Sequence, residues 1–362
     1  MKILFLMPAK GGQMDGWTRY TNDLAETLSA DHEVIFERSF RNPLAYLKNP
    51  ILLLSDSYKV RQAIYVHKPD VVHVTLEPYV LFFAFMKPVG VKIILTVHGS
   101  YSYIPAVVSR IWRPLYKAFY IAALRHTNAI IAVSEYTKGY LLRALKAANI
   151  FELSKKISVV HNGINVSLIQ FRADALPTEK KTLLTVAPVK RRKGIIESLR
   201  AVARYKEAYN GSIEYRIVGS YDFNSTYGKV VADEIAQLGL SNTVTFVGRV
   251  SEEKLQQEYA SADLFLMLPV VNEPYFEGFG LVYLEANTFG VPVVGSNQGG
   301  SAEAIQEGVS GYTADPQAPR EAAERIHDIL DSHTIERSSA RGWAEAHDIK
   351  IIAGKVSEIY RQ

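Results

Sequence analysis

Short apolar runs alternate with amphipathic stretches along the whole 362-residue chain. Runs rich in Val, Ile and Leu occupy residues 2–7, 33–37, 71–75, 92–97, 129–133 and 157–160. After a break the alternation resumes at residues 182–187, 213–218, 243–247, 263–268 and 291–295, with helical stretches such as 195–206 and 252–260 between them. Strands of this kind, separated by helices, are typical of parallel sheets covered on both faces. The pattern predicts an α/β protein with two doubly wound, Rossmann-like domains.

Length and the break in the pattern indicate where the domains divide. A chain of this length exceeds what one hydrophobic core usually supports. At residues 171–181, FRADALPTEKK, proline and charged residues replace the apolar periodicity, so we place the linker there. We predict a first domain over 1–175 and a second over 176–343. Ligands bind outside the carboxyl ends of such strands, so a cleft between two facing sheets is the expected site.

Composition narrows the class of protein. Cysteine is absent, which excludes disulfides and thiolate metal sites and suits a cytoplasmic protein. The opening apolar run has no cleavage site after it, and Lys87, Pro88, Gly90 and Lys92 interrupt the tract 79–97, so we predict neither a signal peptide nor a membrane span. The net charge of +4 hides an asymmetry, because residues 1–175 hold 21 Lys and Arg against 12 Asp and Glu. The first domain is basic and the second is acidic.

The most informative segment is residues 272–305, NEPYFEGFGLVYLEANTFGVPVVGSNQGGSAEAI. Helix formers begin at Leu281, so Glu277 should lie in the loop before a helix and Glu285 about two turns inside it. The two carboxylates would be roughly 10 Å apart, with the free N–H groups of the first turn between them. A helix N-terminus attracts phosphate, and carboxylates accept hydrogen bonds from sugar hydroxyls. The segment therefore predicts a sugar-nucleotide site.

Two other interpretations of these carboxylates stay open. Glu277 could simply favour the helix N-terminus, with Glu285 a solvated helix residue. A glycosidase also uses two carboxylates, roughly 5–9.5 Å apart. No tryptophan lies near the segment to form a sugar platform, however, and hydrolysis would leave the phosphate-attracting elements without a function. Sugar transfer is therefore favoured over hydrolysis.

A glycine loop follows the first predicted strand. Gly11, Gly12 and Gly16 precede a helix that begins near Trp17, and such a loop lets the backbone approach a diphosphate closely. The spacing differs from G-x-G-x-x-G, so a dinucleotide fingerprint is absent. A plain turn is the alternative.

Two further motifs also follow predicted strands. His98 ends the run 92–97, and without an H-x3-H or H-E-x-x-H spacing it is expected to form hydrogen bonds, not to bind zinc; a satisfied loop histidine is the alternative. Four cations, Lys190, Arg191, Arg192 and Lys193, crowd the start of the predicted helix 195–206. The helix dipole disfavours each of them there by about 0.3–1 kcal/mol, so we expect an anionic ligand; a solvated basic turn is the alternative.

With these motifs assembled, the chain resembles retaining glycosyltransferases of the GT-B fold, specifically glycosyltransferase family four. Residues 277–305 match the family's E-x7-E signature and the G-x-P-V strand and GG-x-x-E turn that follow it. Weaker matches are GWTRYTNDLAETL, VHGS, VVHNGIN, TFVGRV and VKRRKG. The resemblance implies two Rossmann-like domains facing across a cleft, and a C-terminal helix, about 344–362, that crosses back to the first domain.

The resemblance also implies roles for individual residues. His98, Lys193 and Glu277 would be the catalytic residues: His98 would lie beside the transferred sugar, Lys193 would hold the phosphates and Glu277 would bind the sugar hydroxyls. The other donor contacts would be Gly16 at the diphosphate, Glu285 at the ribose, and the backbone N–H groups of Phe279, Gly280 and Leu281. Where the family has an arginine five residues before the lysine, this chain has Pro188, so Arg191 or Arg192 would replace it.

The resemblance thus predicts a retaining hexosyltransferase. It would move a hexose from a UDP- or GDP-sugar to a hydroxyl of a glycan, glycolipid or lipid-linked acceptor in surface polysaccharide or glycoconjugate synthesis. Neither a metal, a further cofactor nor a nucleic-acid partner is expected. A GT-B epimerase or phosphorylase, or a non-catalytic scaffold subunit, are the alternatives.

The basic first domain contains VVSRIWRPLYKAFYIAALR, in which Arg110, Arg113 and Lys117 recur at helical spacing among aromatic residues. This pattern predicts docking on an anionic membrane surface, or binding of a lipid-pyrophosphate acceptor. Pro114 interrupts the stretch, and an amphipathic core helix is the alternative. We therefore expect a cytoplasmic protein that works at the inner face of the membrane.

Overall fold

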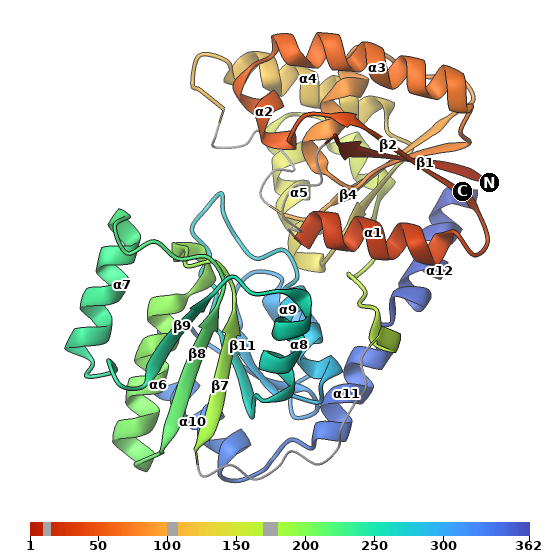
Figure 1. The fold of residues 1–362 in the computed structure, drawn as a ribbon. Coiled ribbons are helices and arrows are strands. Elements are labelled where there is room, and N and C mark those ends of the chain that lie inside the picture. Colours follow the sequence, from red (N-terminus) through yellow and green to blue (C-terminus); the bar gives the residue numbers. More distant parts are fainter. Residues whose placement is uncertain (10–15, 100–107, 169–179) are drawn as a thin grey trace. The chain divides into compact units, whose positions relative to one another are not determined.

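The computed structural model describes residues 1–9, 16–99, 108–168 and 180–362. The chain forms two compact units (Figure 1). Unit 1 comprises Met1–Asn165 and Ile349–Gln362, and unit 2 comprises Val166–Asp348. Residues 171–179 of the predicted linker, 171–181, lie outside the described residues.

Unit 1 is built on a six-stranded parallel sheet with the order β2-β1-β3-β4-β5-β6. Its strands are β1 (Lys2–Pro8), β2 (Glu33–Phe40), β3 (Val71–Val74), β4 (Lys92–Val97), β5 (Ala129–Ala132) and β6 (Ile157–Val159). The residues of β3 are all buried, and those of β1 and β4 nearly so, as expected of strands covered on both faces. The strand order reverses between β1 and β3, where ligands bind in doubly wound sheets.

Helices cover both faces of the unit 1 sheet. On one face, α1 (Gly16–Leu28) packs with the C-terminal helix α12 (Ile349–Arg361), and the hydroxyl of Tyr360 lies 2.5 Å from Nδ1 of His73 on β3. On the other face lie α2 (Pro43–Lys48), α3 (Ile51–His67), the 3-10 helix η1 (Glu77–Ala84), α4 (Arg113–His126) and α5 (Glu135–Ala147), followed in the chain by η2 (Phe151–Lys156). The C-terminal helix therefore belongs to the first domain, as expected.

Unit 2 is built on a second six-stranded parallel sheet with the order β12-β11-β10-β7-β8-β9. Its strands are β7 (Lys181–Val186), β8 (Ile213–Val218), β9 (Val244–Gly248), β10 (Leu264–Met267), β11 (Val293–Ser296) and β12 (Gly311–Ala314). This is the 3-2-1-4-5-6 order of dinucleotide-binding sheets, with the reversal between β7 and β10. Strand β12 was not predicted, because GYTA contains no apolar run.

The remaining helices belong to unit 2. They are η3 (Val166–Leu168), η4 (Arg191–Lys193), α6 (Ile195–Tyr209), α7 (Thr226–Gln237), α8 (Glu252–Ala260), α9 (Leu281–Thr288), η5 (Ser301–Ala304), α10 (Pro319–Leu330) and α11 (Arg337–Ala346). The stretch 344–362, expected to form the crossing helix, contains the end of α11 and the whole of α12, with a break at His347 and Asp348. Within the described residues, no helix combines the length and the apolar character needed to span a bilayer.

Candidate active site

In unit 2, the sheet order brings the segment after β7 against the segment after β10. The basic turn after β7 forms η4, and Gly194 ends it with a left-handed φ of 66°. A Cβ on Gly194 would lie 1.6 Å from the carbonyl oxygen of Leu268, just beyond β10. The backbone N–H of Val270 also donates to the carbonyl of Arg192 at 3.2 Å. These contacts fix the basic turn against the chain that leads to Glu277.

The two segments meet in an ion-pair cluster around Glu277. The Nζ atom of Lys193 lies 2.6 Å from Oε2 of Glu277, and Nη1 of Arg192 lies 3.0 Å from the same oxygen. The side chains of Lys193 and Glu277 are only 10% and 14% exposed. The other oxygen of Glu277, Oε1, has no hydrogen-bond partner among the residues that the structure describes. The cluster thus holds two cations and one carboxylate that keeps one oxygen available.

Electrostatics keep this carboxylate ionised. Burial raises the pKa of Glu277, but the charges and hydrogen bonds of Lys193 and Arg192 outweigh burial, so the pKa is lower than usual. The charge of Glu285 also acts on Lys193. Lys193 therefore lies within reach of both carboxylates that the sequence singled out.

Of the two arginines that were candidates to replace the family arginine, only Arg192 contacts Glu277 in the described structure. Arg191 is exposed, and its charge acts instead on Glu197 of α6 and Tyr227 of α7. The 3-10 turn of η4 therefore places Arg192 at Glu277 and Arg191 on the side of α6 and α7.

Helix α9 begins at Leu281, as predicted, and Gly280 precedes it with a left-handed φ of 87°. No side chain caps this N-terminus, so the N–H groups of the first turn have no partner within the helix. Phe279 is buried, and Leu281 is partly exposed. A Cβ on Gly280 would lie 2.6 Å from the ring of Tyr283, so the fold itself requires a glycine here.

Glu285 lies differently from the sequence prediction. It is the fifth residue of the eight-residue α9, so it lies just over one turn inside the helix and not two. Its side chain is buried, and Oε2 accepts a hydrogen bond of 2.6 Å from the hydroxyl of Tyr259 at the end of α8. The interpretation of Glu285 as a solvated helix residue is therefore wrong.

The glycine pair Gly299-Gly300 contacts the main chain of Glu277. The N–H of Gly300 donates to the carbonyl of Glu277 at 2.8 Å. Gly299 has a φ of 68°, and a Cβ there would lie 2.9 Å from the same carbonyl oxygen. The GG-x-x-E turn thus positions the backbone of the carboxylate in the cluster.

In unit 1, the motifs after β1, β3 and β4 lie side by side. The ring of His98, just after β4, lies 4.9 Å from the ring of Tyr20 and 6.5 Å from that of Trp17, both in the first turns of α1. Gly16 begins α1, and a Cβ there would meet no atom within 4 Å. The fold does not require a glycine at position 16. Gly11 and Gly12 lie outside the described residues.

The surroundings of His98 favour its neutral form. Burial lowers its pKa to about 3, although a hydrogen bond to the main-chain carbonyl of Thr75 opposes this. Its Nε2 atom is buried and has no partner among the described residues, so Nδ1 is the atom that bonds Thr75. A carbonyl only accepts, which places the proton on Nδ1 and leaves a lone pair on Nε2.

Glu77, at the start of η1 just after β3, was missed at the sequence level. Its Oε1 accepts from the backbone N–H of Gly99 at 3.0 Å and from that of His98. The residue is 1% exposed, and burial raises its pKa to about 8, against the effect of the two N–H groups. One signal was present in the sequence: Glu77 is the single acidic residue between Asp70 and Glu135.

The predicted basic stretch 107–125 is organised differently from the prediction. Pro114 lies in the first turn of α4 and starts this helix instead of interrupting it. Arg110 precedes α4, so it does not share a helix with Arg113 and Lys117. Among the described residues there is also no group of three His, Cys, Asp or Glu side chains that could hold a metal ion.

Two family models match the chain, one to each half. The model described as Glycosyltransferase Family 4 matches residues 14–168, and that described as Glycosyl transferases group 1 matches residues 167–346. The chain belongs to this glycosyltransferase family and has the GT-B fold.

Curated relatives and solved structures agree with this assignment. An uncharacterized glycosyltransferase of Methanocaldococcus jannaschii is 33% identical over 48% of this chain and 45% of its own length. The GDP-mannose-dependent alpha-(1-6)-phosphatidylinositol monomannoside mannosyltransferase of Mycobacterium tuberculosis is 26% identical over 61% of this chain and 58% of its own length. The crystal structure of Anabaena HepE in complex with UDP superimposes with a TM-score of 0.75 at 20% identity, covering 99% of both chains. The chain spans about half the length of the curated relatives it matches.

Proposed function

We propose that this protein is a retaining, metal-independent hexosyltransferase that uses a nucleoside diphosphate sugar as donor. The observation that carries the proposal is the cluster of Arg192, Lys193 and Glu277 at the carboxyl ends of β7 and β10. The cluster offers two cations to a diphosphate and one carboxylate oxygen to sugar hydroxyls. The uncapped N-terminus of α9 follows Glu277 closely in the chain and adds N–H donors.

The relatives support a UDP- or GDP-linked donor. Anabaena HepE was crystallised with UDP and with UDP-glucose, and the mycobacterial relative is named as dependent on GDP-mannose. Both nucleotides carry the same diphosphate, which is the part that Lys193 and Arg192 are proposed to bind. Glu285 is proposed to bind the ribose with the carboxylate that Tyr259 holds in place.

In unit 1, His98 is proposed to accept a hydrogen bond from the donor sugar, and Gly16 to leave space for the donor diphosphate. Neutral His98 offers the lone pair of Nε2 to a hydroxyl of the transferred sugar, and it adds no charge. Gly16 leaves space for a diphosphate to approach the start of α1. Glu77 acts through the backbone of His98 and Gly99, so it is a positioning residue.

The proposed reaction retains the anomeric configuration. The bond between the anomeric carbon and the leaving phosphate oxygen breaks, and the acceptor oxygen bonds to the same face of that carbon. The leaving oxygen takes the proton of the acceptor hydroxyl, so no protein nucleophile is needed. The contribution of the protein is electrostatic, because Lys193 and Arg192 stabilise the charge that develops on the diphosphate.

We propose a hydroxyl of a glycan, glycolipid or lipid-linked sugar as the acceptor, with the protein at a cytoplasmic membrane surface and a role in glycoconjugate synthesis. The strongly basic composition of residues 1–175 supports an acceptor or surface that carries negative charge.

The test has two steps. Thermal-shift screening against UDP- and GDP-sugars should find one donor that raises the melting temperature of the wild-type protein and not that of Lys193→Ala or Glu277→Ala. Acceptor extracts supplied with that donor should then yield free nucleoside diphosphate and a glycosylated product with retained configuration. Binding of no UDP- or GDP-sugar would favour a scaffold subunit. Conversion of the donor without acceptor would favour an epimerase, and dependence on orthophosphate would favour a phosphorylase.

A further inference from the structure

Helix α3 of unit 1 carries apolar residues on its outer face as well as on its inner one. Leu53, Val60 and Ala63 are buried against the sheet side. The outer face carries exposed apolar and aromatic residues near helical spacing: Ile51 (72% exposed), Leu54 (58%), Tyr58 (61%), Tyr65 (80%) and Val66 (70%). The other exposed residues of α3 are Ser55, Arg61 and Gln62. Five of the eight exposed residues of this helix are therefore apolar or aromatic, which is more than a surface helix usually shows.

The chain segments that form this part of unit 1 carry many more Lys and Arg residues than acids. From Arg38 to Lys68 the chain carries six Lys or Arg residues and one acid, Asp56. Residues 78–134 contain six further Lys or Arg and no acid. On α3 itself, Arg61 lies between Tyr58 and Tyr65 and is exposed, while Glu37 of β2 lies 3.6 Å from His67 at the end of the helix.

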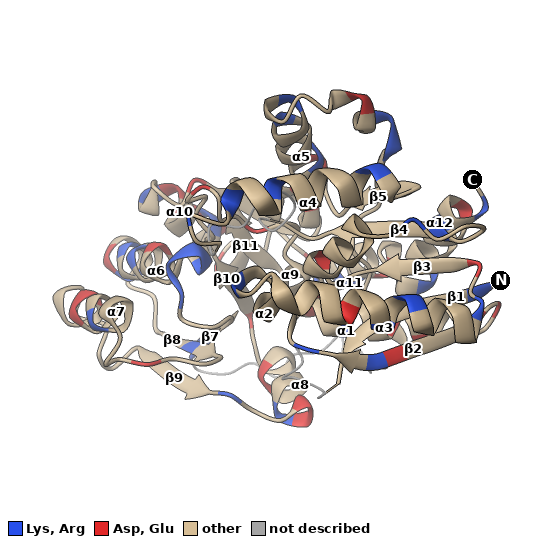
Figure 2. Ribbon diagram, turned by 90° about the horizontal axis from the view of Figure 1, so that it is seen from above, with Lys and Arg blue, Asp and Glu red and all other residues tan. Residues whose placement is uncertain are grey.

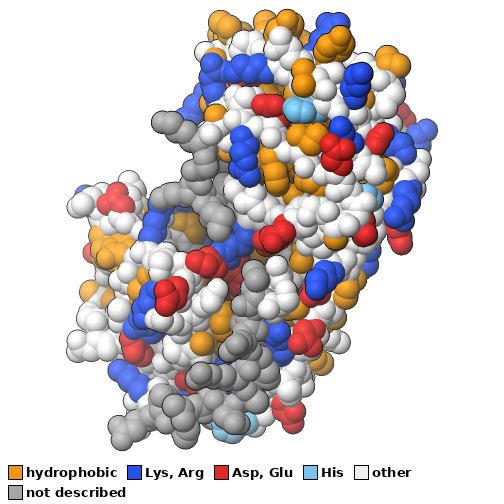
Figure 3. Space-filling model, turned by 45° about the vertical axis from the view of Figure 1, so that its right-hand side comes forward, with side chains coloured by type: hydrophobic (Ala, Val, Ile, Leu, Met, Phe, Trp, Pro, Cys, Tyr) orange, Lys and Arg blue, Asp and Glu red, His pale blue; other side chains and the backbone are white. Residues whose placement is uncertain are grey.

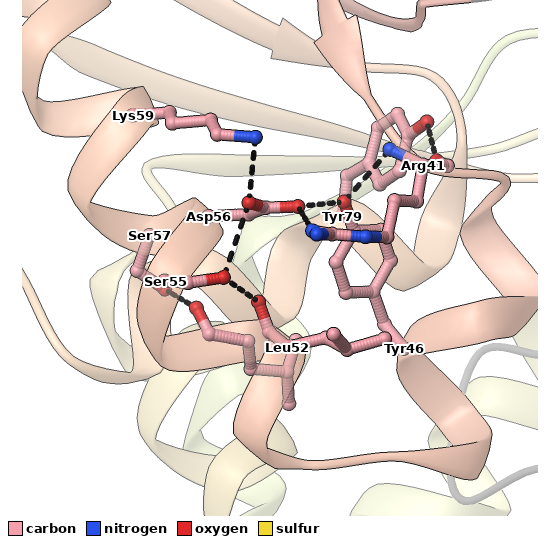
Figure 4. Close-up of polar contacts among 9 residues, drawn as sticks. Arg41, Tyr46, Leu52, Ser55, Asp56, Ser57, Lys59 and Tyr79 are labelled. Atoms are coloured by element: carbon pink, nitrogen blue, oxygen red, sulfur yellow. Dashed lines mark hydrogen bonds and ion pairs between the residues drawn. The ribbon is translucent and has the colours of Figure 1, made fainter.

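The single acid of α3 is turned away from the outer face (Figure 4). Asp56 is 0% exposed, and its carboxylate accepts from Nη1 of Arg41 at 2.5 Å and from the hydroxyl of Tyr46 at 2.6 Å. Lys59 lies 2.9 Å from its other oxygen. Burial raises the pKa of Asp56, but these three partners bring it below its usual value. Asp56 is therefore an internal anchor for α3, and the two cations that bind it outnumber its charge.

The start of α4 lies on the same side of unit 1 as α3. Helices α2, α3 and α4 all pack against η1, on the same face of the unit 1 sheet (Figure 1). Ile111 (78% exposed), Trp112 (42%) and Leu115 (36%) are exposed there, beside the basic residues Arg113 and Lys117. Figure 2 shows Lys and Arg but no acid along α4. In Figure 3, hydrophobic side chains and cations gather along the upper edge, where α3 and α4 lie in Figure 1.

We propose that the outer face of α3 and the start of α4 form a docking surface for an anionic lipid bilayer. Tyrosine, tryptophan and aliphatic side chains flanked by Lys and Arg are typical of surfaces that lie in the lipid headgroup region. A second copy of this chain fits less well, because two such faces would bring like charges together. The inference rests on the proposed function for its biological sense, but vesicle binding requires no sugar transfer, so the two can fail separately.

The experiment is co-sedimentation of the full chain with vesicles of phosphatidylcholine alone and with phosphatidylglycerol added. We expect the wild-type protein to bind the anionic vesicles at low salt, to bind neutral vesicles weakly, and to dissociate as salt screens the cations. Failure to bind anionic vesicles at low salt would overturn the proposal while leaving soluble-donor binding as a separate test of the function.

Three variants locate the surface. Leu54→Gln/Tyr58→Gln/Tyr65→Gln removes the apolar face and should reduce binding by about tenfold or more. Arg61→Gln/Arg113→Gln/Lys117→Gln should reduce it by about fivefold for each cation. The matched control, Val230→Gln/Ile351→Gln, changes two other exposed apolar residues (46% and 47% exposed) and should bind like wild type.

Melting temperatures and molar masses complete the test. All variants should melt near the wild-type temperature, because the changed residues are at the surface. Equal binding by the apolar variant and the control would overturn the proposal. A wild-type dimer in solution that the apolar variant converts to a monomer would show that the face is an interface between copies, and it would also overturn the proposal.

Discussion

The two sheets are both six-stranded and parallel, and each reverses its strand order once, but the side chains beyond their carboxyl ends differ in charge. In unit 2, the strand reversal joins β7 and β10, and the residues beyond them form an ionised cluster of Lys193, Arg192 and Glu277. In unit 1, the residues beyond β3 and β4 are Glu77 and His98, whose pKa values burial moves to about 8 and about 3. Both of these values move toward the neutral form of the side chain.

The difference follows from the partners that each group has. Glu277 is paired with two cations, which overcome the cost of its burial. Glu77 has only backbone N–H groups, and its Oε2 has no partner among the described residues. We call Lys193, Arg192 and Glu277 the charged end, and Glu77 and His98 the neutral end. In the proposed reaction, the charged end binds the diphosphate and the neutral end faces uncharged hydroxyls. Equivalent positions in the two sheets therefore differ in charge because the partners of their side chains differ.

The largest expected effect is on the charged end. Lys193→Ala should lower the transfer rate by roughly 10²–10³, because it removes a cation from the leaving diphosphate. The matched control is Lys190→Ala, in the same basic turn but exposed, which should retain near-normal transfer. Steady-state rates with a fixed donor measure both variants. Equal loss in the two would contradict the assignment of Lys193.

The next largest effect is structural. Gly194→Ala should lower the free energy of unfolding by at least about 3 kcal/mol, because a Cβ would clash with the carbonyl of Leu268 in a left-handed backbone. Denaturant unfolding followed by circular dichroism measures this change. A variant as stable as wild type would show that η4 is not fixed against β10.

The pH dependence of the free energy of unfolding tests the shifted pKa of Glu77. The folded pKa of Glu77 is raised to about 8 from about 4.5, so the unfolded chain ionises first as pH rises. The stability that protonated Glu77 contributes is complete below about pH 4.5 and is lost as pH rises toward 8, by up to about 1.4 kcal/mol for each pH unit.

Glu77→Gln is neutral at every pH and keeps an oxygen that accepts from both N–H groups. The difference in unfolding free energy between wild type and this variant should therefore decline between pH 4.5 and 8, in chemical denaturation at a series of pH values. A difference that is constant with pH would mean that Glu77 titrates normally.

The smallest expected effect is at the start of α1. Gly16→Ala should leave the melting temperature unchanged, because the added Cβ meets no atom within 4 Å. It should weaken donor binding by about tenfold, or about 1.4 kcal/mol, if a diphosphate approaches this backbone. Unchanged donor affinity would remove Gly16 from the site.

Sequence reasoning recovered the fold because buried parallel strands are apolar throughout and repeat at regular intervals. It missed β12, since Gly311, Tyr312 and Thr313 form no apolar run. It also recovered the position of Glu277 before α9, because the helix formers after Gly280 define that boundary.

Three features of the candidate site depend on tertiary geometry. The partners of Glu77 are backbone N–H groups 21 and 22 residues away, and these leave no trace in side-chain composition. The choice between Arg191 and Arg192 depends on how η4 turns. The burial of Glu285 depends on contact with Tyr259 of another helix. Each of these depends on contacts between elements and not on local pattern.

The most direct test of the contrast between the two ends is isothermal titration with a nucleoside diphosphate and its sugar-linked form, using whichever of UDP or GDP binds wild type. Lys193→Ala should weaken binding of both ligands, because both carry the diphosphate. His98→Ala should weaken binding of the nucleotide sugar and leave that of the diphosphate unchanged. If the two variants affect both ligands alike, or affect neither, the division between a charged and a neutral end is wrong.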